Sequence, residues 1–386
     1  MVFCNKPWRE IHYYSSGVVG SCCRKPAGPH LLGALTDDPL EVWGGERFNH
    51  LRKLVQEDKV WEAGCGTCVD LSCDVVKESF PVVREEHGFP QHVFLQLSYL
   101  CNLHCSHCCQ GKERRESPVV MQEFPVSVFK RVYDAFFQDA LNFIFIGGEA
   151  LANPNFPKLL AVMHPGENPG CRVNVVTNGL LLRDNLPLFT RFPNFNIHVS
   201  VDAANEPVYR RIRGASWRRL RMNLEAYRCW ADRNGLEWSM ILNFLLMHSN
   251  IHQVPKMLDL AEELGAEASF GMVYGCFKHE NLFLYRELRD TAWETAIDMG
   301  VEKLRWKDEL WARNAVKNLL GAKHYLLQPG VSIHDSDSKA VDYWNHQVCS
   351  RNGVVFKPER LRRAAHLLRE GKVKHLAKRV LARVIS

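Results

Sequence analysis

Long apolar runs are absent from this sequence of 386 residues. A membrane-spanning helix needs about 20 consecutive apolar residues, and the apolar stretches here are interrupted well before that length. The first residues, MVFCNKPWREI, carry charges where a secretion signal has its apolar centre. The sequence therefore predicts a cytoplasmic protein without membrane-spanning helices.

Excess positive charge is also missing from most of the chain. The net charge is +6, but residues 357–386 contain ten Lys or Arg against two Glu, so the remainder sums to about −2. Proteins that bind nucleic acid usually carry a basic surface, and this balance argues against a nucleic-acid enzyme. In the tail, apolar residues recur at helical spacing between basic ones. This predicts a surface helix, with contact to a membrane surface or an anionic partner as alternatives.

Internal repeats and low-complexity segments are lacking, and composition separates four regions: 1–73, rich in Cys, Gly and Trp; 74–91, a polar connector; 92–275; and 276–386, mainly helical with the basic tail. The third region alternates short β-branched or aromatic runs with helical patterns. Strands are expected at 92–98, 142–146, 172–177, 195–201, 238–247 and 267–273. Helices are expected at 125–139, 155–163, 180–189, 207–230 and 252–264. Such alternation predicts an α/β domain with a parallel sheet, barrel-like or doubly wound.

Cysteine is abundant, with 14 residues, and a reducing compartment leaves thiols free for metals. Cys101, Cys105 and Cys108 follow the first expected strand. Three thiolates on one short loop can hold three irons of a [4Fe–4S] cluster and leave the fourth iron an open coordination position. The alternative is a zinc site with its remaining ligand from a neighbour: His104, His107 or Cys109. We expect both histidines to pack within the loop instead.

The motifs carry a family resemblance. The run CNLHCSHC at 101–108 resembles the signature of the radical SAM superfamily, and IGGEA at 146–150 resembles its GGE motif. TNG at 177–179, VSVDA at 199–203 and EPVYRRIRG at 206–214 are similar to family segments that contact the cosubstrate. The resemblance covers roughly residues 92–275. It implies a partial (β/α)6 barrel that uses S-adenosylmethionine and a [4Fe–4S] cluster.

The resemblance also implies roles for single residues. Cys101, Cys105 and Cys108 would be the catalytic metal ligands. Residues that would bind the cosubstrate are Gly147, Gly148, Glu149, Asn178, Ser200, Asp202 and Arg213. Among them Glu149 would receive the amino group, the 177–179 and 199–203 segments would contact the methionine and ribose portions, and Arg213 would meet the carboxylate. The residue types agree, because paired glycines let a ligand approach the backbone and charged side chains suit an ammonium and a carboxylate. For Asp202 a helix N-cap is an open alternative.

Residues 1–73 resemble a twitch domain, the shorter relative of the SPASM domain, which holds an auxiliary [4Fe–4S] cluster. By position, its ligands would be Cys4, Cys22, Cys65 and Cys68. In the family this domain usually follows the barrel, whereas here it precedes it. Within residues 1–73 only Cys73 follows Cys68, so one auxiliary cluster is expected rather than two. A structural zinc ribbon on the same four cysteines is the alternative.

As the resemblance implies, an electron donor such as flavodoxin or ferredoxin reduces the cluster. S-adenosylmethionine is then cleaved to a 5′-deoxyadenosyl radical, which removes a hydrogen atom from the substrate. The auxiliary cluster would accept the substrate electron, for a net oxidation. The sequence favours a small metabolite, such as a sugar, aminocyclitol or amino acid derivative, because little chain precedes Cys4 for a leader-binding domain. The alternatives are a maturase of a ribosomally made peptide, or a non-catalytic iron–sulfur or zinc scaffold protein.

Overall fold

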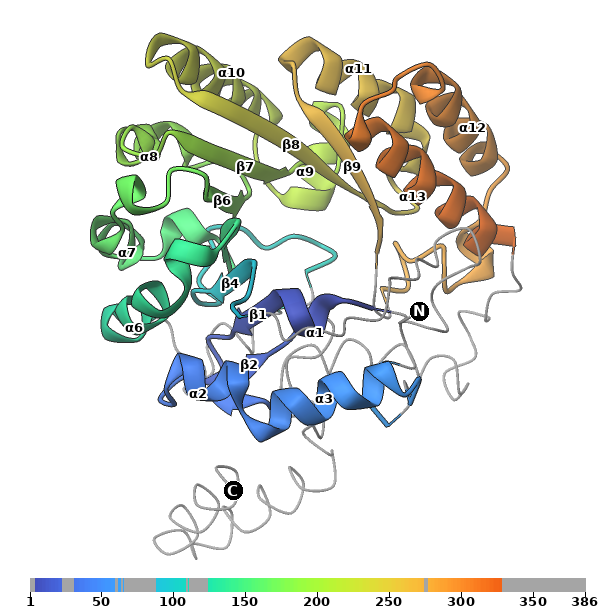
Figure 1. Cartoon of the computed structure of the whole chain (residues 1–386). Helices are drawn as coiled ribbons and strands as arrows, with labels where there is room; N and C mark the ends of the chain where they lie inside the picture. The colour runs from blue at the N-terminus through green and yellow to red at the C-terminus, as the bar shows by residue number, and fades with distance from the viewer. Residues whose placement is uncertain are drawn as a thin grey trace, which may run out of the picture.

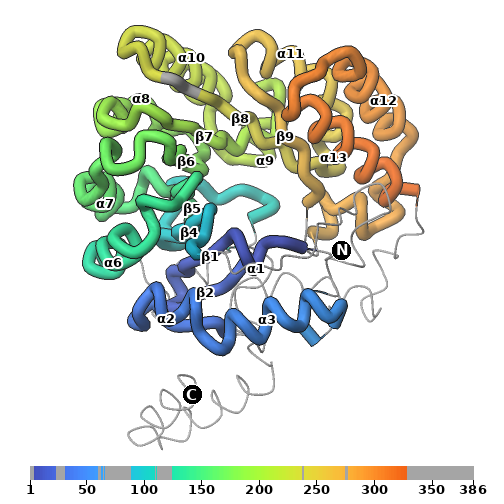
Figure 2. The backbone as a smooth tube through the Cα atoms, in the orientation of Figure 1, coloured from blue at the N-terminus to red at the C-terminus, as the bar shows by residue number. Residues whose placement is uncertain are grey.

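The computed structural model describes residues 4–22, 31–59, 62–63, 65, 88–108, 110, 124–273 and 277–327, without the side chains of Glu237 and Trp238. Within this part, nine strands form one sheet in the order β3-β2-β1-β4-β5-β6-β7-β8-β9. The strands curve around a common interior, and the helices α6, α7, α8, α10 and α11 form an outer layer (Figure 1; the tube in Figure 2 traces the same path). The fold is therefore α/β and barrel-like, as the sequence predicted.

Six parallel strands lie where the sequence predicted them: β4 (His92–Gln96), β5 (Asn142–Ile146), β6 (Arg172–Thr177), β7 (Asn194–Ser200), β8 (Glu237–Leu246) and β9 (Glu267–Met272). Alternate side chains, such as Phe143 and Phe145 of β5, are fully buried against the helices. The intervening residues face the barrel interior. In that interior, side-chain hydrogen bonds run from strand to strand through Asn142, Asn174 and Asn196.

The helices follow their predicted positions with one difference. They are α6 (Val126–Phe136), α7 (Phe156–Val162), α8 (Leu182–Phe189), α9 (Glu206–Arg213), α10 (Trp217–Arg233) and α11 (Val254–Leu264). Short 3-10 turns are η1 (Phe137–Asp139), η2 (Ala150–Ala152), η3 (Pro165–Glu167), η4 (Ile251–Gln253) and η5 (Arg286–Leu288). The stretch expected as one helix over 207–230 is two helices. Gly214 adopts a left-handed conformation that ends α9, and the Ser216 side chain caps α10 by accepting from Arg219 N.

The described N-terminal residues extend the barrel sheet. Their elements are α1 (Lys6–Arg9), β1 (Glu10–Tyr13), β2 (Val18–Gly20), β3 (Gly33–Ala34), α2 (Pro39–Gly44) and α3 (Glu46–Gln56). Strand β1 runs parallel to β4, and β2 is antiparallel to β1. Ile11 of β1 is fully buried in the same hydrophobic core as Val93 and Leu95 of β4. The sheet is thus longer than the six strands expected, while the boundary at residue 73 stays a prediction because residues 66–87 lie outside the described part.

The described residues after β9 are mainly helical, as expected, with α12 (Ala292–Leu304) and α13 (Leu310–Leu327). Figure 1 shows both helices beside β9 and α11. The basic tail lies outside the described residues. Among the helices of the described part, none combines the length and apolar character that crossing a membrane requires.

The shared core predicts that the N-terminal strands unfold together with the barrel. Replacing Ile11, a fully buried residue, by alanine should lower the free energy of unfolding by about 2–5 kcal/mol. Replacing Leu40, which is 47% exposed, should change it by no more than about 0.5 kcal/mol. Urea denaturation followed by circular dichroism and tryptophan fluorescence measures both. A separate early transition in Ile11→Ala, with the main transition unmoved, would show that the N-terminal part folds independently.

Candidate active site

The three expected ligand cysteines lie on the loop that follows β4. Cys101, Cys105 and Cys108 are half-buried. Burial raises the pKa of the Cys101 and Cys105 thiols, and negative charge on neighbouring thiols raises it further. The loop is fixed to α9, because Ser106 N donates to Ile212 O at 2.9 Å. The three thiols thus lie on the single loop that follows β4, and their role as cluster ligands stays a prediction.

The GGE turn is pressed against the start of this loop. Gly148 N donates to Ser98 O at 2.8 Å, and Glu149 N donates to Leu100 O at 2.7 Å. A Cβ atom on Gly148 would lie 2.2 Å from Leu100 O, and one on Gly147 would lie 2.9 Å from Ser98 O. Close approach does require both glycines. However, the backbone that approaches them belongs to the chain itself and not to a ligand.

Glu149 is a buried carboxylate held by neutral donors. Its Oε1 accepts from Leu151 N at 3.1 Å and from the Thr177 hydroxyl at 2.6 Å, while Oε2 accepts from Asn178 N at 2.6 Å. Burial raises the pKa of Glu149, and these hydrogen bonds, together with the more distant charge of Arg213, oppose the rise. Among the residues described, no Lys, Arg or His lies within ion-pair distance of this carboxylate. A bound cation would stabilise its charged form.

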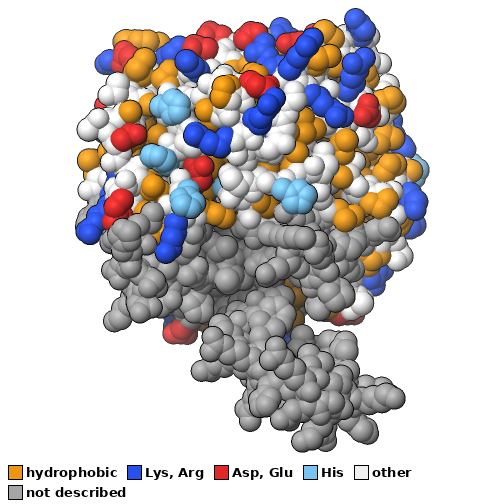
Figure 3. Space-filling view, turned by 180° about the vertical axis from the view of Figure 1, so that it is seen from behind, with side chains coloured by type: hydrophobic (Ala, Val, Ile, Leu, Met, Phe, Trp, Pro, Cys, Tyr) orange, Lys and Arg blue, Asp and Glu red, His pale blue; other side chains and the backbone are white. Residues whose placement is uncertain are grey.

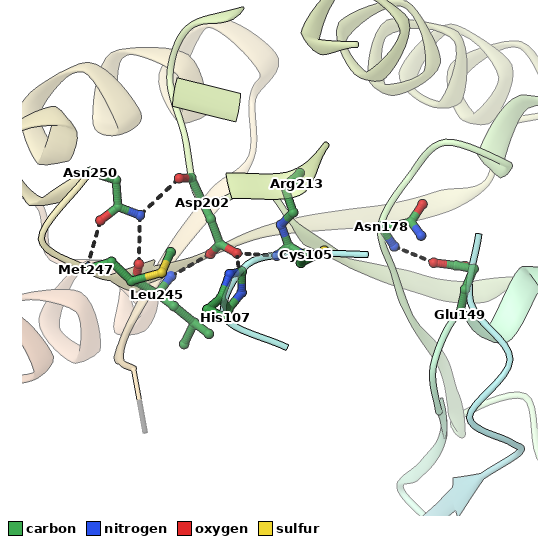
Figure 4. A network of polar contacts seen from close by, with 9 residues as sticks. All are labelled: Cys105, His107, Glu149, Asn178, Asp202, Arg213, Leu245, Met247 and Asn250. Atoms are coloured by element: carbon green, nitrogen blue, oxygen red, sulfur yellow. Dashed lines mark hydrogen bonds and ion pairs between the residues drawn. The ribbon is translucent and has the colours of Figure 1, made fainter. Parts of the chain in front are cut away.

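Asn178 connects Glu149 to the cysteine loop. Its backbone N–H binds the Glu149 carboxylate, and its side-chain Nδ2 donates to Asn102 Oδ1 at 2.7 Å. The same Nδ2 lies 4.0 Å from the Sγ atom of Cys101. The contact of Asn178 with Glu149 is drawn on the right of Figure 4. The ends of β5 and β6 are therefore connected to the cysteine loop through one residue, Asn178, by its backbone and its side chain.

Asp202 follows the end of β7 and is the centre of a second network (Figure 4). It is buried and has a left-handed backbone conformation, with φ of 56°. One carboxylate oxygen accepts from Leu245 N at 2.7 Å. The other accepts from the Arg213 guanidinium and lies 3.2 Å from Nε2 of His107. Asn250 donates to the backbone oxygen of Asp202 at 2.9 Å. Both carboxylate oxygens are thus occupied by protein donors.

The N-cap alternative for Asp202 is wrong. Helix α9 is capped by Asn205, whose side chain accepts from Val208 N at 3.1 Å. Asp202 lies three residues earlier, and its side chain turns instead toward the cysteine loop and β8.

Arg213 lies between Asp202 and the cysteine loop. One of its terminal nitrogens binds Asp202, and the other lies 3.6 Å from Cys105 Sγ. Burial alone would lower the pKa of Arg213, but Asp202 and Cys105 raise it above its ordinary value. Likewise burial would raise the pKa of Asp202, yet Arg213 and His107 hold it below the ordinary value. The buried Nε of Arg213 has no hydrogen-bond partner within the described residues.

The two loop histidines differ from expectation. His107 is buried, but it makes a polar link to Asp202 in addition to packing. His104 is exposed, so its expected packing role is wrong. Ser200 is the last residue of β7 and is half-buried at the same end of the sheet. Sequence reasoning gave no role to Asn102, which lies inside the CNLHCSHC run, or to Asn250, which belongs to none of the recognised motifs.

The expected auxiliary ligands are described only in part. Cys4, Cys22 and Cys65 are half-buried, and Cys68 lies outside the described residues, as does Cys109. Within the described residues, no three His, Cys, Asp or Glu side chains converge as ligands of a single metal ion. A [4Fe–4S] cube takes each cysteine on a different iron, so the loop thiols fit such a cluster without converging on one point.

Comparison with known proteins agrees with this geometry. Residues 95–261 match the sequence family described as the radical SAM superfamily. A PqqA peptide cyclase from Streptomyces rochei is 28% identical over 183 residues, which are 47% of each chain. An AdoMet-dependent heme synthase from Methanosarcina barkeri is 26% identical over 183 residues, 46% of this chain and 49% of the relative. The alignments thus span about half the length of these curated relatives.

Solved structures are similar at lower identity. SuiB from Streptococcus suis bound to its precursor peptide SuiA is 15% identical, with a TM-score of 0.44, over 75% of this chain and 67% of that one. The same protein bound to S-adenosylmethionine is 14% identical, with a TM-score of 0.39, over 59% and 52%. These values are too low to carry an argument about function.

Radical SAM proteins are enzymes that use a [4Fe–4S] cluster and S-adenosylmethionine. The expectations of an enzyme and of these two cofactors are therefore confirmed at the level of the family. Residues 95–261, which carry the three-cysteine loop, the GGE turn and the Asp202 network, are a radical SAM domain.

Proposed function

We propose that Cys101, Cys105 and Cys108 hold the [4Fe–4S] cluster of this domain and that the chain cleaves S-adenosylmethionine reductively. The supporting observation is the compact loop of three half-buried thiols, fixed to α9 and to the GGE turn. The bound cofactors supply a 5′-deoxyadenosyl radical that removes a hydrogen atom from the substrate. The protein binds and orients the reactants and excludes water.

Glu149 and Arg213 are the residues that we propose for the charged groups of the cosubstrate. Glu149 would bind the ammonium group. Its buried carboxylate has no ion-pair partner among the described residues, and the ammonium group would be that partner. Arg213 would bind the carboxylate through its buried Nε, which has no hydrogen-bond partner there. Asn178 and Ser200 stay candidates for contacts to the methionine and ribose portions. Gly147 and Gly148 act by letting the GGE turn pack closely.

We assign Asp202 a positioning role instead of a direct ribose contact. Its carboxylate oxygens already accept from Leu245 N, Arg213 and His107. These contacts orient Arg213 toward the cosubstrate and connect β7, α9, β8 and the cysteine loop. Removing the charge would leave the Arg213 guanidinium buried without its ion-pair partner.

For the substrate we propose a peptide, which reverses the preference drawn from the sequence. One curated relative is named as a peptide cyclase, although the other is named as a heme synthase. The barrel interior offers a suitable group. Gln96 ends β4, faces the interior and carries a buried Oε1 atom without a hydrogen-bond partner in the described part of the chain. A peptide N–H group is a matching donor.

An auxiliary cluster on Cys4, Cys22, Cys65 and Cys68 stays part of the proposal, as does an external electron donor. Support for this cluster comes from the sequence pattern and from the half-buried thiols of the three described cysteines. Four thiolates would leave no iron open to substrate, which suits electron transfer.

Replacing any one of Cys101, Cys105 and Cys108 by alanine should abolish 5′-deoxyadenosine formation from S-adenosylmethionine with dithionite, measured anaerobically by chromatography. Iron analysis should give about eight irons per wild-type chain with an auxiliary cluster and about four without it. Cys229→Ala, at an exposed cysteine, is the matched control and should keep full activity. Unchanged activity in the three loop variants would refute the cluster assignment.

Asp202→Asn keeps the side-chain size and removes the charge. It should lower the free energy of unfolding by about 3–5 kcal/mol, because a buried ion pair loses one partner. It should also weaken S-adenosylmethionine binding at unchanged iron content, measured by the cosubstrate-induced change in the electron paramagnetic resonance spectrum. The control is Asp58→Asn, because Asp58 also has a left-handed backbone, with φ of 60°, but is exposed. Unaltered cosubstrate affinity in Asp202→Asn would contradict the positioning role.

The peptide proposal predicts that a precursor peptide encoded beside this gene binds the chain and stimulates cosubstrate cleavage. Gln96→Leu should raise KM for that peptide about fivefold to tenfold, the effect of one lost hydrogen bond. Cleavage of S-adenosylmethionine without peptide should not change. Gln138→Leu, at an exposed glutamine, serves as control. Stimulation by small sugars or amino acid derivatives, and none by the peptide, would restore the small-metabolite alternative.

A further inference from the structure

A groove of about 390 Å³ lies between α8 and α10, at their first turns. Its lining includes Leu180, Arg183, Arg218, Arg219, Met222 and Asn223. Both helices begin where the parallel strands end, so the groove opens at the same end of the barrel as the cysteine loop. Figure 1 shows α8 and α10 as neighbours in the outer helical layer.

The groove is positively charged and its arginines have no internal partner. The side chains of Arg183, Arg218 and Arg219 are exposed, and within the described residues none makes an ion pair or side-chain hydrogen bond. Arg221 on the same helix is different, because it binds Glu263 and Glu225. In the view from behind, basic and acidic side chains are interspersed along the top of the molecule (Figure 3). Three free guanidinium groups against one carboxylate, Asp184, make the groove a site for an anionic partner.

The wall of the groove is connected to the expected cluster ligands. Asn223 Nδ2 donates to Gly179 O at 2.8 Å, and Leu180 N donates to Asn178 Oδ1 at 3.0 Å. The Nδ2 of that same Asn178 lies 4.0 Å from Cys101 Sγ. The backbone of Leu180, at the groove, is therefore connected through the side chain of Asn178 to Cys101, one of the expected cluster ligands.

We propose that this groove docks an acidic protein that delivers the electron for cosubstrate cleavage. The proposal rests on the proposed function, since only reductive cleavage requires such a donor. In the step, the docked protein loses one electron and the cluster site gains it, and no bond or proton changes at the groove. Weak electron-transfer complexes form over small interfaces, and charge complementarity sets their association rates.

An electron donor fits this position better than a substrate does. The groove is lined by residues of α8, α10 and the turns that precede them, and both helices belong to the outer layer that surrounds the sheet (Figure 1). A substrate must touch the radical to lose a hydrogen atom, so it must reach the interior. An electron can cross the intervening protein without such contact.

The test compares cluster reduction by a purified acidic bacterial flavodoxin and by dithionite, in anaerobic stopped-flow experiments on the cluster-loaded enzyme. In R183E/R218E/R219E the rate with flavodoxin should fall about tenfold or more at low salt. The difference should shrink as added salt screens the charges. The rate with dithionite, and the 5′-deoxyadenosine formed with it, should stay unchanged. The neutral variant R218Q/R219Q should show a smaller effect of the same kind.

Arg233→Glu is the matched control, because Arg233 is exposed at the opposite end of α10. It should leave both rates unchanged. Equal reduction rates with flavodoxin in all variants would overturn the docking site. It would also be overturned if the charge-reversal and neutral variants lost as much of the reduction rate with dithionite as with flavodoxin. If the arginine variants raised KM for the peptide and left the flavodoxin rates unchanged, the groove would instead bind an acidic segment of the substrate, and the electron-donor proposal would be wrong. Absence of 5′-deoxyadenosine from the wild-type enzyme with dithionite would refute the proposed function itself.

Discussion

The buried ion pair between Asp202 and Arg213 is the interaction on which the site depends. A charge removed from water is tolerated only when an opposite charge and further donors surround it. Here Leu245 N and His107 complete the shell of the carboxylate, and Cys105 lies beside the guanidinium. The ends of β7 and β8, helix α9 and the cysteine loop therefore hold their relative positions, because each contributes a group to this one buried ion pair or to its hydrogen-bonding shell.

Glu149 and Asp202 show how environment separates two buried carboxylates. Asp202 has a cation beside it, and its pKa lies below the ordinary value. Glu149 is surrounded by neutral donors, and burial raises its pKa. The charge of Asp202 is thus balanced by the protein itself, whereas the charge of Glu149 can be balanced by a positive group of a bound molecule. This difference, rather than motif membership, supports assigning one to structure and the other to the cosubstrate.

Much of the barrel could be predicted because its signals are local. The strand β5 alternates fully buried aromatic residues with interior-facing ones, and the cysteine spacing of the loop is visible in the sequence. The break between α9 and α10 was missed although Gly214 marks it, because apolar periodicity continues across the gap. The pairing of β1 with β4 could not be predicted, since a four-residue strand joins a partner some 80 residues away. The role of Asn250 could not be predicted for a similar reason: Asn250 lies 48 residues after Asp202 in the sequence, and the fold brings the two together at the same end of the sheet.

The parallel pairing of β1 with β4 also bears on how this protein can be shortened. Without the N-terminal residues, β4 would present a row of unsatisfied backbone N–H and C=O groups at the rim of the sheet, next to the apolar surface that Ile11 covers. Such exposed edges recruit strands from other molecules and lead to aggregation. A truncated chain that begins near the first motif would thus be prone to self-association.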